Sequence, residues 1–103
     1  MSEAFVAHWT VPADHPAFPG HFPGRPILPG VVLLDRLLAL VSAATGRGVA
    51  GTLIANTKFL SPVGPGETLR FAWLEQANGA IRFDIEAGGR AVATGLLTLP
   101  AAP

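Results

Sequence analysis

The sequence predicts an α+β domain in which one antiparallel β-sheet wraps around one long central α-helix. Two observations lead to this prediction. An apolar segment over residues 31–45 has helical character, and four strand-like segments follow it through short turns. Another strand-like segment precedes the helix. One sheet covered by one helix is the economical way to bury the apolar faces of both. We expect residues 1–103 to form a single domain.

The first strand and the loop after it come before the helix. Residues 4–11 alternate as a half-buried strand does, with an apolar face of Phe5, Ala7, Trp9 and Val11. From Pro12 to Pro29 the chain contains six prolines, which predicts a stiff loop. A loop of this length in a compact domain usually has a function. Because proline disfavours the helical region for the residue before it, the helix can begin only around Gly30.

The helix should run from Val31 to about Thr45, and Gly46 is placed to end it as a left-handed cap. Apolar residues cover most of its circumference, so we expect it to be buried on most sides. Its carboxylate, Asp35, falls on a narrow stripe of small residues that continues through Ala39.

Four strands are expected after the helix, at residues 52–60, 67–76, 81–86 and 90–99. Asn78-Gly79 predicts a type I′ hairpin turn between two of them, and Gly88-Gly89 predicts a second tight turn. Short connections of this kind make neighbouring strands antiparallel.

Composition excludes several classes of function. Half the residues are hydrophobic and only 14% are charged, which suggests that another copy of the chain covers some apolar surface. Seven basic residues balance seven acidic ones, so no basic field for nucleic acid or an anionic membrane is expected. The absence of cysteine excludes disulfides and thiolate metal sites and fits a cytoplasmic protein. No signal peptide is expected, and Asp35 and Arg36 interrupt the longest apolar run, so we expect no membrane span.

Two motifs carry a resemblance to a known family. The first is His21-Phe22-Pro23-Gly24-Arg25-Pro26-Ile27-Leu28-Pro29-Gly30-Val31, with Asp35 on the helix that follows. The second is Lys58-Phe59-Leu60-Ser61-Pro62-Val63-Gly64-Pro65-Gly66-Glu67-Thr68-Leu69. Over residues 5–99 the chain resembles the 3-hydroxyacyl-[acyl-carrier-protein] dehydratases, which have the hotdog fold. Most members of the larger branch carry Glu at the position of Asp35, whereas the branch that also isomerises carries Asp.

Dehydration of a 3-hydroxyacyl thioester needs a base at C2, an acid for the hydroxyl at C3, and a donor to the thioester oxygen. His21 is the candidate base, because the pKa of histidine lies near neutrality. Asp35 is the candidate proton donor, since a carboxylate in an apolar helix tends to have a raised pKa and no Lys or Arg lies one helical turn away. The Gly30 N–H, at the helix start, is the candidate donor to the thioester oxygen.

The resemblance implies more than the spacing does. In these dehydratases the histidine and the acid of one active site come from different subunits of a dimer, so His21 would face Asp35 of a second copy. Phe22, Gly30 and Val31 would contact the substrate, and the backbone at His21-Phe22 would be unusual, with a cis peptide bond as one form. The substrate would be carried on the phosphopantetheine of acyl carrier protein, with no other cofactor and no metal. Arg25, Arg36, Arg47 and Lys58 are the candidate contacts to that acidic carrier.

Other interpretations stay open. A histidine in a proline-rich loop is often structural, Asp35 can lie on a solvated stripe, and Gly30 can be only a break before the helix. A hotdog thioesterase shares the fold, although its acid usually works without a His-Phe-Pro-Gly loop. A non-catalytic subunit of a heteromeric dehydratase is the third interpretation, and it would be free to lose His21 and Asp35.

Overall fold

The computed structural model describes residues 4–18 and 26–100, and these ranges contain one helix and one five-stranded sheet. The elements are β1 (Ala4–Thr10), α1 (Gly30–Thr45), β2 (Leu53–Phe59), β3 (Thr68–Glu75), β4 (Ile81–Ala87) and β5 (Arg90–Thr98). The strand order is β1-β3-β4-β5-β2, and every neighbouring pair is antiparallel. The predicted α+β architecture is confirmed, with each expected strand within one or two residues of its observed bounds.

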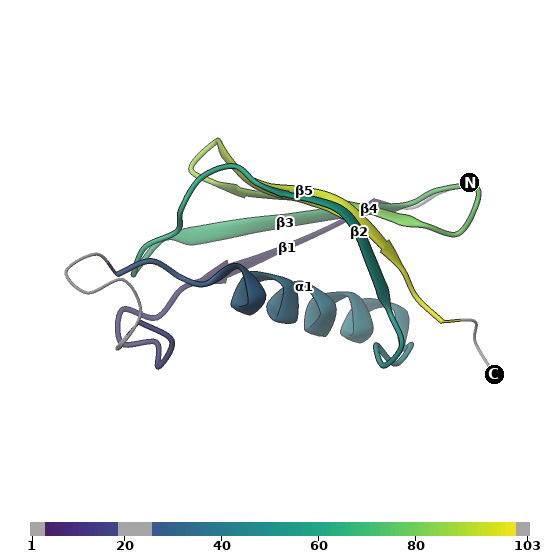
Figure 1. Cartoon of the computed structure of the whole chain (residues 1–103), viewed down its shortest axis with the longest axis horizontal. Helices are drawn as coiled ribbons and strands as arrows, with labels where there is room; N and C mark the ends of the chain where they lie inside the picture. The colour runs from purple at the N-terminus through teal and green to yellow at the C-terminus, as the bar shows by residue number, and fades with distance from the viewer. Residues whose placement is uncertain (1–3, 19–25, 101–103) are drawn as a thin grey trace.

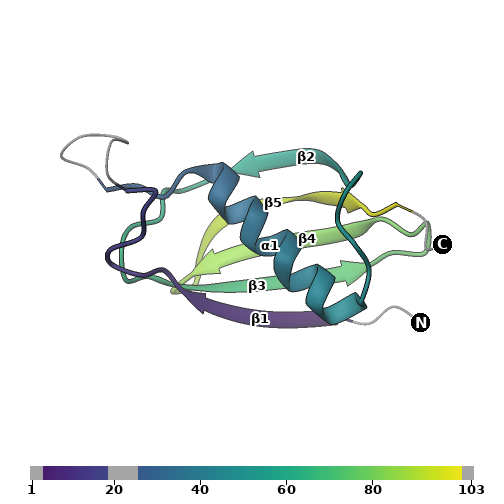
Figure 2. The same ribbon diagram turned by 90° about the horizontal axis from the view of Figure 1, so that it is seen from below.

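The helix crosses one face of the curved sheet, and the opposite face has no helix on it (Figure 1). Seen from below, α1 runs obliquely, from the β2 side at its start to the β1 side at its end (Figure 2). Gly46 ends it in the predicted left-handed conformation, with φ 72° and an N–H bond of 2.8 Å to the Ser42 carbonyl. With 16 residues, α1 is too short to cross a membrane, and it is the one helix in the described ranges.

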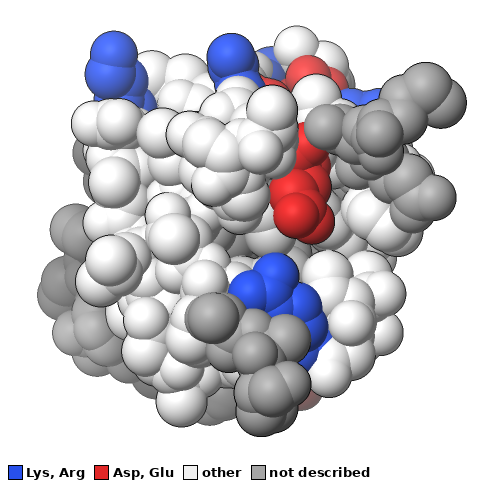
Figure 3. All heavy atoms as spheres, turned by 90° about the vertical axis from the view of Figure 1, so that its right-hand side faces the viewer, with Lys and Arg blue, Asp and Glu red and all other residues white. Residues whose placement is uncertain are grey.

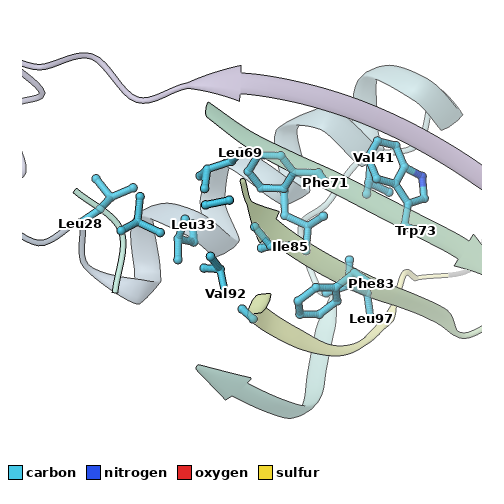
Figure 4. Packing of buried hydrophobic residues seen from close by; sticks show 14 of the residues in the cluster. Leu28, Leu33, Val41, Leu69, Phe71, Trp73, Phe83, Ile85, Val92 and Leu97 are labelled. Carbon is cyan, nitrogen blue, oxygen red and sulfur yellow. The ribbon is translucent and has the colours of Figure 1, made fainter. Parts of the chain in front are cut away.

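The core lies between α1 and the inner faces of β3, β4 and β5 (Figure 4). Phe71, Phe83 and Leu37 of α1 are fully buried and belong to this core. Alternation along the strands produces this face, because every second residue of β4 points inward and is buried. Full burial of one such side chain stabilises the fold by about 1.5–3 kcal/mol.

The expectation that α1 would be buried on most sides is wrong for the single chain. Its buried residues are Leu33, Leu37 and Val41, which form one stripe against the sheet. Val31, on another face, is 72% exposed. One sheet can cover only one side of a helix, so other apolar side chains of α1 are only partly buried, namely Val32, Leu34, Leu38 and Leu40.

The hairpin between β3 and β4 forms, but its turn is not of type I′. Among the described residues, Asn56 is the one non-glycine residue with positive φ, so Asn78 does not have the left-handed conformation that a type I′ turn requires. Instead, the Gly79 N–H donates to the Gln76 carbonyl, and Gly79 alone is left-handed, with φ 86°. This is a type I turn followed by a left-handed glycine. At the next hairpin, Gly88 and Gly89 both have positive φ, as a tight two-residue turn requires.

Candidate active site

Three of the predicted site residues, His21, Phe22 and Arg25, lie outside the described residues. The predicted unusual backbone at His21-Phe22 lies there too. The described part of the site begins at Pro26, where the chain leads into α1. The role of His21 stays a prediction from the sequence.

The start of α1 is fixed by the proline and by a contact to a distant turn. Pro29 is extended, with φ −61° and ψ 145°, and the helix begins at Gly30, as predicted. Just before it, the Leu28 N–H donates to the Val63 carbonyl at 2.8 Å. No side chain caps the start of α1. In its first turn the Val32 N–H donates to the Pro29 carbonyl at 3.0 Å, whereas the N–H groups of Gly30 and Val31 have no partner among the described residues and are available to an oxygen of a ligand.

Gly30 also has a packing role that the sequence did not reveal. A Cβ atom at Gly30 would lie 2.7 Å from Cζ of Phe59, closer than such atoms approach. The Phe59 side chain comes from the end of β2 and is 53% exposed. Glycine at this position therefore lets the ring of Phe59 pass over the helix start. The interpretation of Gly30 as a mere break before the helix omits this contact.

A groove of about 530 Å³ opens at the same place, and its lining is mostly apolar. Leu28, Val31 and Phe59 are among its lining residues, together with Leu60 and Val63. It therefore joins two of the predicted substrate contacts, Gly30 and Val31, to the end of β2. Phe59 and Leu60 were not predicted as site residues, although the Lys58–Leu69 motif that contains them was the signal that could have identified them.

Asp35 lies on the open side of α1, one turn after Val31. Its side chain is exposed, as is that of Ala39 one turn further on. The burial that the sequence predicts for this carboxyl is therefore absent on the single chain. The physical reason is the same as for the helix as a whole: the sheet covers the opposite side. Within residues 4–18 and 26–100, no side chain covers that of Asp35 enough to bury it.

Three of the candidate contacts to acyl carrier protein, Arg36, Arg47 and Lys58, lie in described residues, and they do not form one patch. The Arg36 guanidinium lies 4.8 Å from the centre of the Trp9 ring, in a cation–π contact between α1 and β1. Arg47, just beyond α1, donates to a carbonyl that follows β5. Lys58 lies on β2, and its neighbour Phe59 faces the helix, so the Lys58 side chain points to the outer face of the sheet. Viewed from the end where α1 stops, charged atoms of both signs are scattered among uncharged ones (Figure 3).

Within residues 4–18 and 26–100, no group of three or more His, Cys, Asp or Glu side chains is arranged to hold a metal ion. His8 is exposed on β1, opposite Arg70 of β3. His15 accepts the Ala17 N–H at Nδ1 over 3.0 Å and packs edge-on against Trp9, so it has a structural role in the loop after β1.

Several curated dehydratases are similar to this chain. The chain is 40% identical over 73 residues to a 3-hydroxyacyl-[acyl-carrier-protein] dehydratase FabZ of Rhizobium rhizogenes, covering 64% of this chain and 46% of the relative. A FabZ of Roseiflexus sp. is 35% identical over 101 residues, which are 91% of this chain and 65% of the relative. The chain spans about half the length of the first of these relatives.

Solved structures agree on the fold. A chain of the dehydratase heterocomplex ApeI:P from Xenorhabdus doucetiae has a TM-score of 0.81 at 23% identity, over 98% of this chain and 95% of that one. An uncharacterized protein from Erwinia carotovora subsp. atroseptica has a TM-score of 0.73 at 29% identity, covering 96% and 84% of the two chains. A mutant of the fluoroacetyl-CoA-specific thioesterase FlK also matches, with a TM-score of 0.67 at 17% identity over 93% of this chain and 82% of that one. These likenesses identify the hotdog fold, which serves more than one reaction.

The family follows from the sequence as a whole. Residues 1–96 match the family model described as ApeI-like, ApeI dehydratase. That match covers nearly the entire chain and includes both motifs, the start of α1 and Asp35. The chain therefore belongs to the ApeI-like dehydratase family of the hotdog fold.

Proposed function

We propose that this protein removes water from a 3-hydroxyacyl thioester carried on acyl carrier protein and forms the trans-2-enoyl thioester. The observation that carries the proposal is the position of Asp35, exposed on the open side of α1 one turn beyond Val31 and the apolar groove. Family membership and the FabZ relatives support the reaction class. The phosphopantetheine arm of the carrier is the prosthetic group that the proposal requires, and it arrives with the substrate.

The reaction needs one base and one acid. In the proposal, His21 takes a proton from C2, the C2–C3 double bond forms, and the C3 hydroxyl leaves. Asp35 enters protonated and gives that proton to the leaving hydroxyl, which departs as water. Transfer of the proton from His21 back to Asp35 through solvent restores both groups. The Gly30 N–H at the start of α1 stabilises the negative charge that develops on the thioester oxygen.

We further propose that two copies of the chain form the working unit. β2 is an edge strand, so one side of it has no hydrogen-bonded neighbour in the sheet. Its apolar side chains are uncovered, with Leu53 69% exposed and Ile54 40% exposed. A second copy placed against β2 would pair that edge and cover the open side of α1, including Asp35. The burial of Asp35 that the single chain lacks would then come from the partner.

Hydration of a trans-2-enoyl thioester on acyl carrier protein, the reverse reaction, tests the function. Mass spectrometry follows the gain of one water by the acyl group. Wild type should add water, and His21→Ala and Asp35→Asn should each lose about a hundredfold or more in rate. Asp84→Asn is the matched control, because this carboxylate lies on the outer face of β4. The fold of each variant is checked by circular dichroism.

Each other outcome has a definite meaning. If wild type hydrolyses the thioester and leaves the double bond unchanged, the protein is a thioesterase. If it does neither, it is a non-catalytic subunit, and its partner must be a different chain. The proposal also includes a cytoplasmic location, which fits the absence of cysteine and is tested by fractionation of cells that produce the protein.

A further inference from the structure

The turn between β2 and β3 is held by a compact set of polar contacts that the proposed chemistry does not use. One Glu67 carboxylate oxygen accepts the Gly64 N–H at 2.7 Å, and the Arg90 Nη2 donates to both oxygens at 2.9 and 3.2 Å. Arg90 also donates to the Pro62 carbonyl at 2.9 Å and, through Nε, to Ser61 Oγ at 3.2 Å. We call Glu67 and Arg90, with the contacts they make, the clasp.

The turn inside the clasp is bonded to the chain on both sides of the His21 segment. The Val11 N–H donates to the Glu67 carbonyl and the Gly66 N–H donates to the Val11 carbonyl, each at 2.9 Å. On the other side, the Leu28 N–H donates to the Val63 carbonyl at 2.8 Å. Val11 precedes His21 in the sequence and Leu28 follows it. One turn therefore fixes the chain before and after the predicted base.

The figures show the same arrangement. The connection from β2 to β3 lies at the end of the molecule where α1 begins, close to the chain that leads from β1 into the loop (Figures 1 and 2). A hollow of about 620 Å³ at this end is lined by Pro26 and Ile27 on the loop side and by Glu67 and Arg90 on the clasp side.

We infer that Glu67 is a positioning residue for the proposed dehydration. By holding the 61–66 turn, it fixes Leu28 two residues before the Gly30 N–H and fixes Val11 at the entry to the His21 segment. The expected effect of Glu67 on the reaction rate rests on the proposed function. Whether Glu67 stabilises the hydrogen bonds of Leu28 and Val11 can be measured without any assay of activity.

A second ion pair shows why the clasp differs from an ordinary surface contact. Arg82 and Asp84 on the outer face of the sheet approach only to 4.0 Å, and their side chains are 62% and 45% exposed. Glu67 is less exposed, at 31%, and binds a backbone N–H as well as a guanidinium. Those two contacts, the Gly64 N–H first and then Arg90, hold the pKa of Glu67 below its usual value despite partial burial.

The test compares Glu67→Ala, Glu67→Asp and the control Asp84→Asn in the hydration assay and by amide hydrogen exchange. In Glu67→Ala we expect kcat to fall about tenfold to a hundredfold with KM nearly unchanged, because a small misplacement of reacting groups has effects of this size. The Leu28 N–H should exchange about tenfold faster, whereas the Phe83 N–H in β4 should exchange as in wild type. Glu67→Asp retains a carboxylate and should recover part of both effects.

Two results of the exchange experiment would overturn the inference. One is wild-type exchange at Leu28 in Glu67→Ala. The other is an equal rise in exchange at Leu28 and Phe83, which would mean that Glu67 supports the whole fold. If wild type lacks hydratase activity, the proposed function fails, and exchange at Leu28 still decides whether the clasp restrains the loop. If wild type is active, Leu28 exchange rises and kcat is unchanged, the clasp is structural and the positioning role is rejected.

Discussion

The two edge strands of the sheet, β1 and β2, have opposite surroundings. The inward side chains of β1 are covered: Phe5 stacks on Trp73 with 5.8 Å between ring centres, and Trp9 packs beneath Arg36. Those of β2 are open, with Ile54 40% and Phe59 53% exposed. The helix accounts for the difference, because its oblique path ends on the β1 side (Figure 2). The α1 helix thus covers the inner face of β1 and leaves that of β2 open, which supports the proposal that a second copy packs against β2.

The largest effect is expected from a charge at the open edge. Leu53→Asp should weaken association of two copies by about a hundredfold, because each copy would bring a negative charge to the β2 edge at which the copies pair. Activity should then depend on protein concentration. Analytical ultracentrifugation measures the association, and Val6→Asp on the outer face of β1, where the native side chain is 48% exposed, is the matched control. Equal weakening in both variants would remove the distinction between the edges.

A smaller effect is expected at the covered edge. Phe5→Ala should lower the free energy of unfolding by about 2 kcal/mol, since it removes a half-buried ring that stacks on Trp73. Urea unfolding at a protein concentration that keeps the subunits separate measures this change. Leu53→Ala under the same conditions should change the free energy of unfolding by less than about 0.5 kcal/mol. A larger loss at Leu53 than at Phe5 would contradict the assignment of the two edges.

At the end of β2, the ring of Phe59 meets the start of α1 at Gly30. Gly30→Ala should cost about 1 kcal/mol of unfolding free energy, because the new methyl group overlaps the Phe59 ring, whose exposed edge can move only in part. Adding Phe59→Ala should remove that cost, so the two substitutions should be non-additive in a double-mutant cycle. Additive losses would show that Gly30 is required by its backbone and not by the ring.

The smallest effect is a pH dependence at the clasp, beside the end of β2. The folded-state pKa of Glu67 is lowered from 4.5 by the Gly64 N–H and Arg90, so its stabilising contribution is complete above the unfolded value and is lost as pH falls through the folded one. The difference in unfolding free energy between wild type and Glu67→Gln should therefore shrink as pH falls below 4.5. A constant difference down to about pH 3 would show that the carboxylate charge does not stabilise the turn.

Local patterns predicted the elements well because their causes are local. Proline at 29, glycine at 46 and the alternation along β4 set the bounds of α1 and the strand faces without reference to distant residues. The prediction of a type I′ turn at Asn78-Gly79 was wrong. The dipeptide suits a type I′ turn, but a longer turn with one left-handed residue formed instead.

Features of the site that depend on distant contacts were not predictable in the same way. The ring of Phe59 over Gly30 and the bond from Leu28 to Val63 join segments far apart in the chain, and no spacing rule connects them. The exposure of Asp35 was missed for a related reason. A helix with apolar residues around most of its surface suggests burial, but the sequence of one chain does not say which side a second molecule covers.

The central claim is that one active site uses His21 of one copy and Asp35 of the other, and mixing two inactive variants tests it most directly. His21→Ala and Asp35→Asn are each purified, mixed in equal amounts under conditions that exchange subunits, and assayed for hydration. We expect recovery to about a quarter of the wild-type rate, because half of the dimers are mixed and each of these has one intact site of two. Failure of the mixture to exceed either variant alone, with exchange of subunits verified by mass, would contradict a site shared between copies.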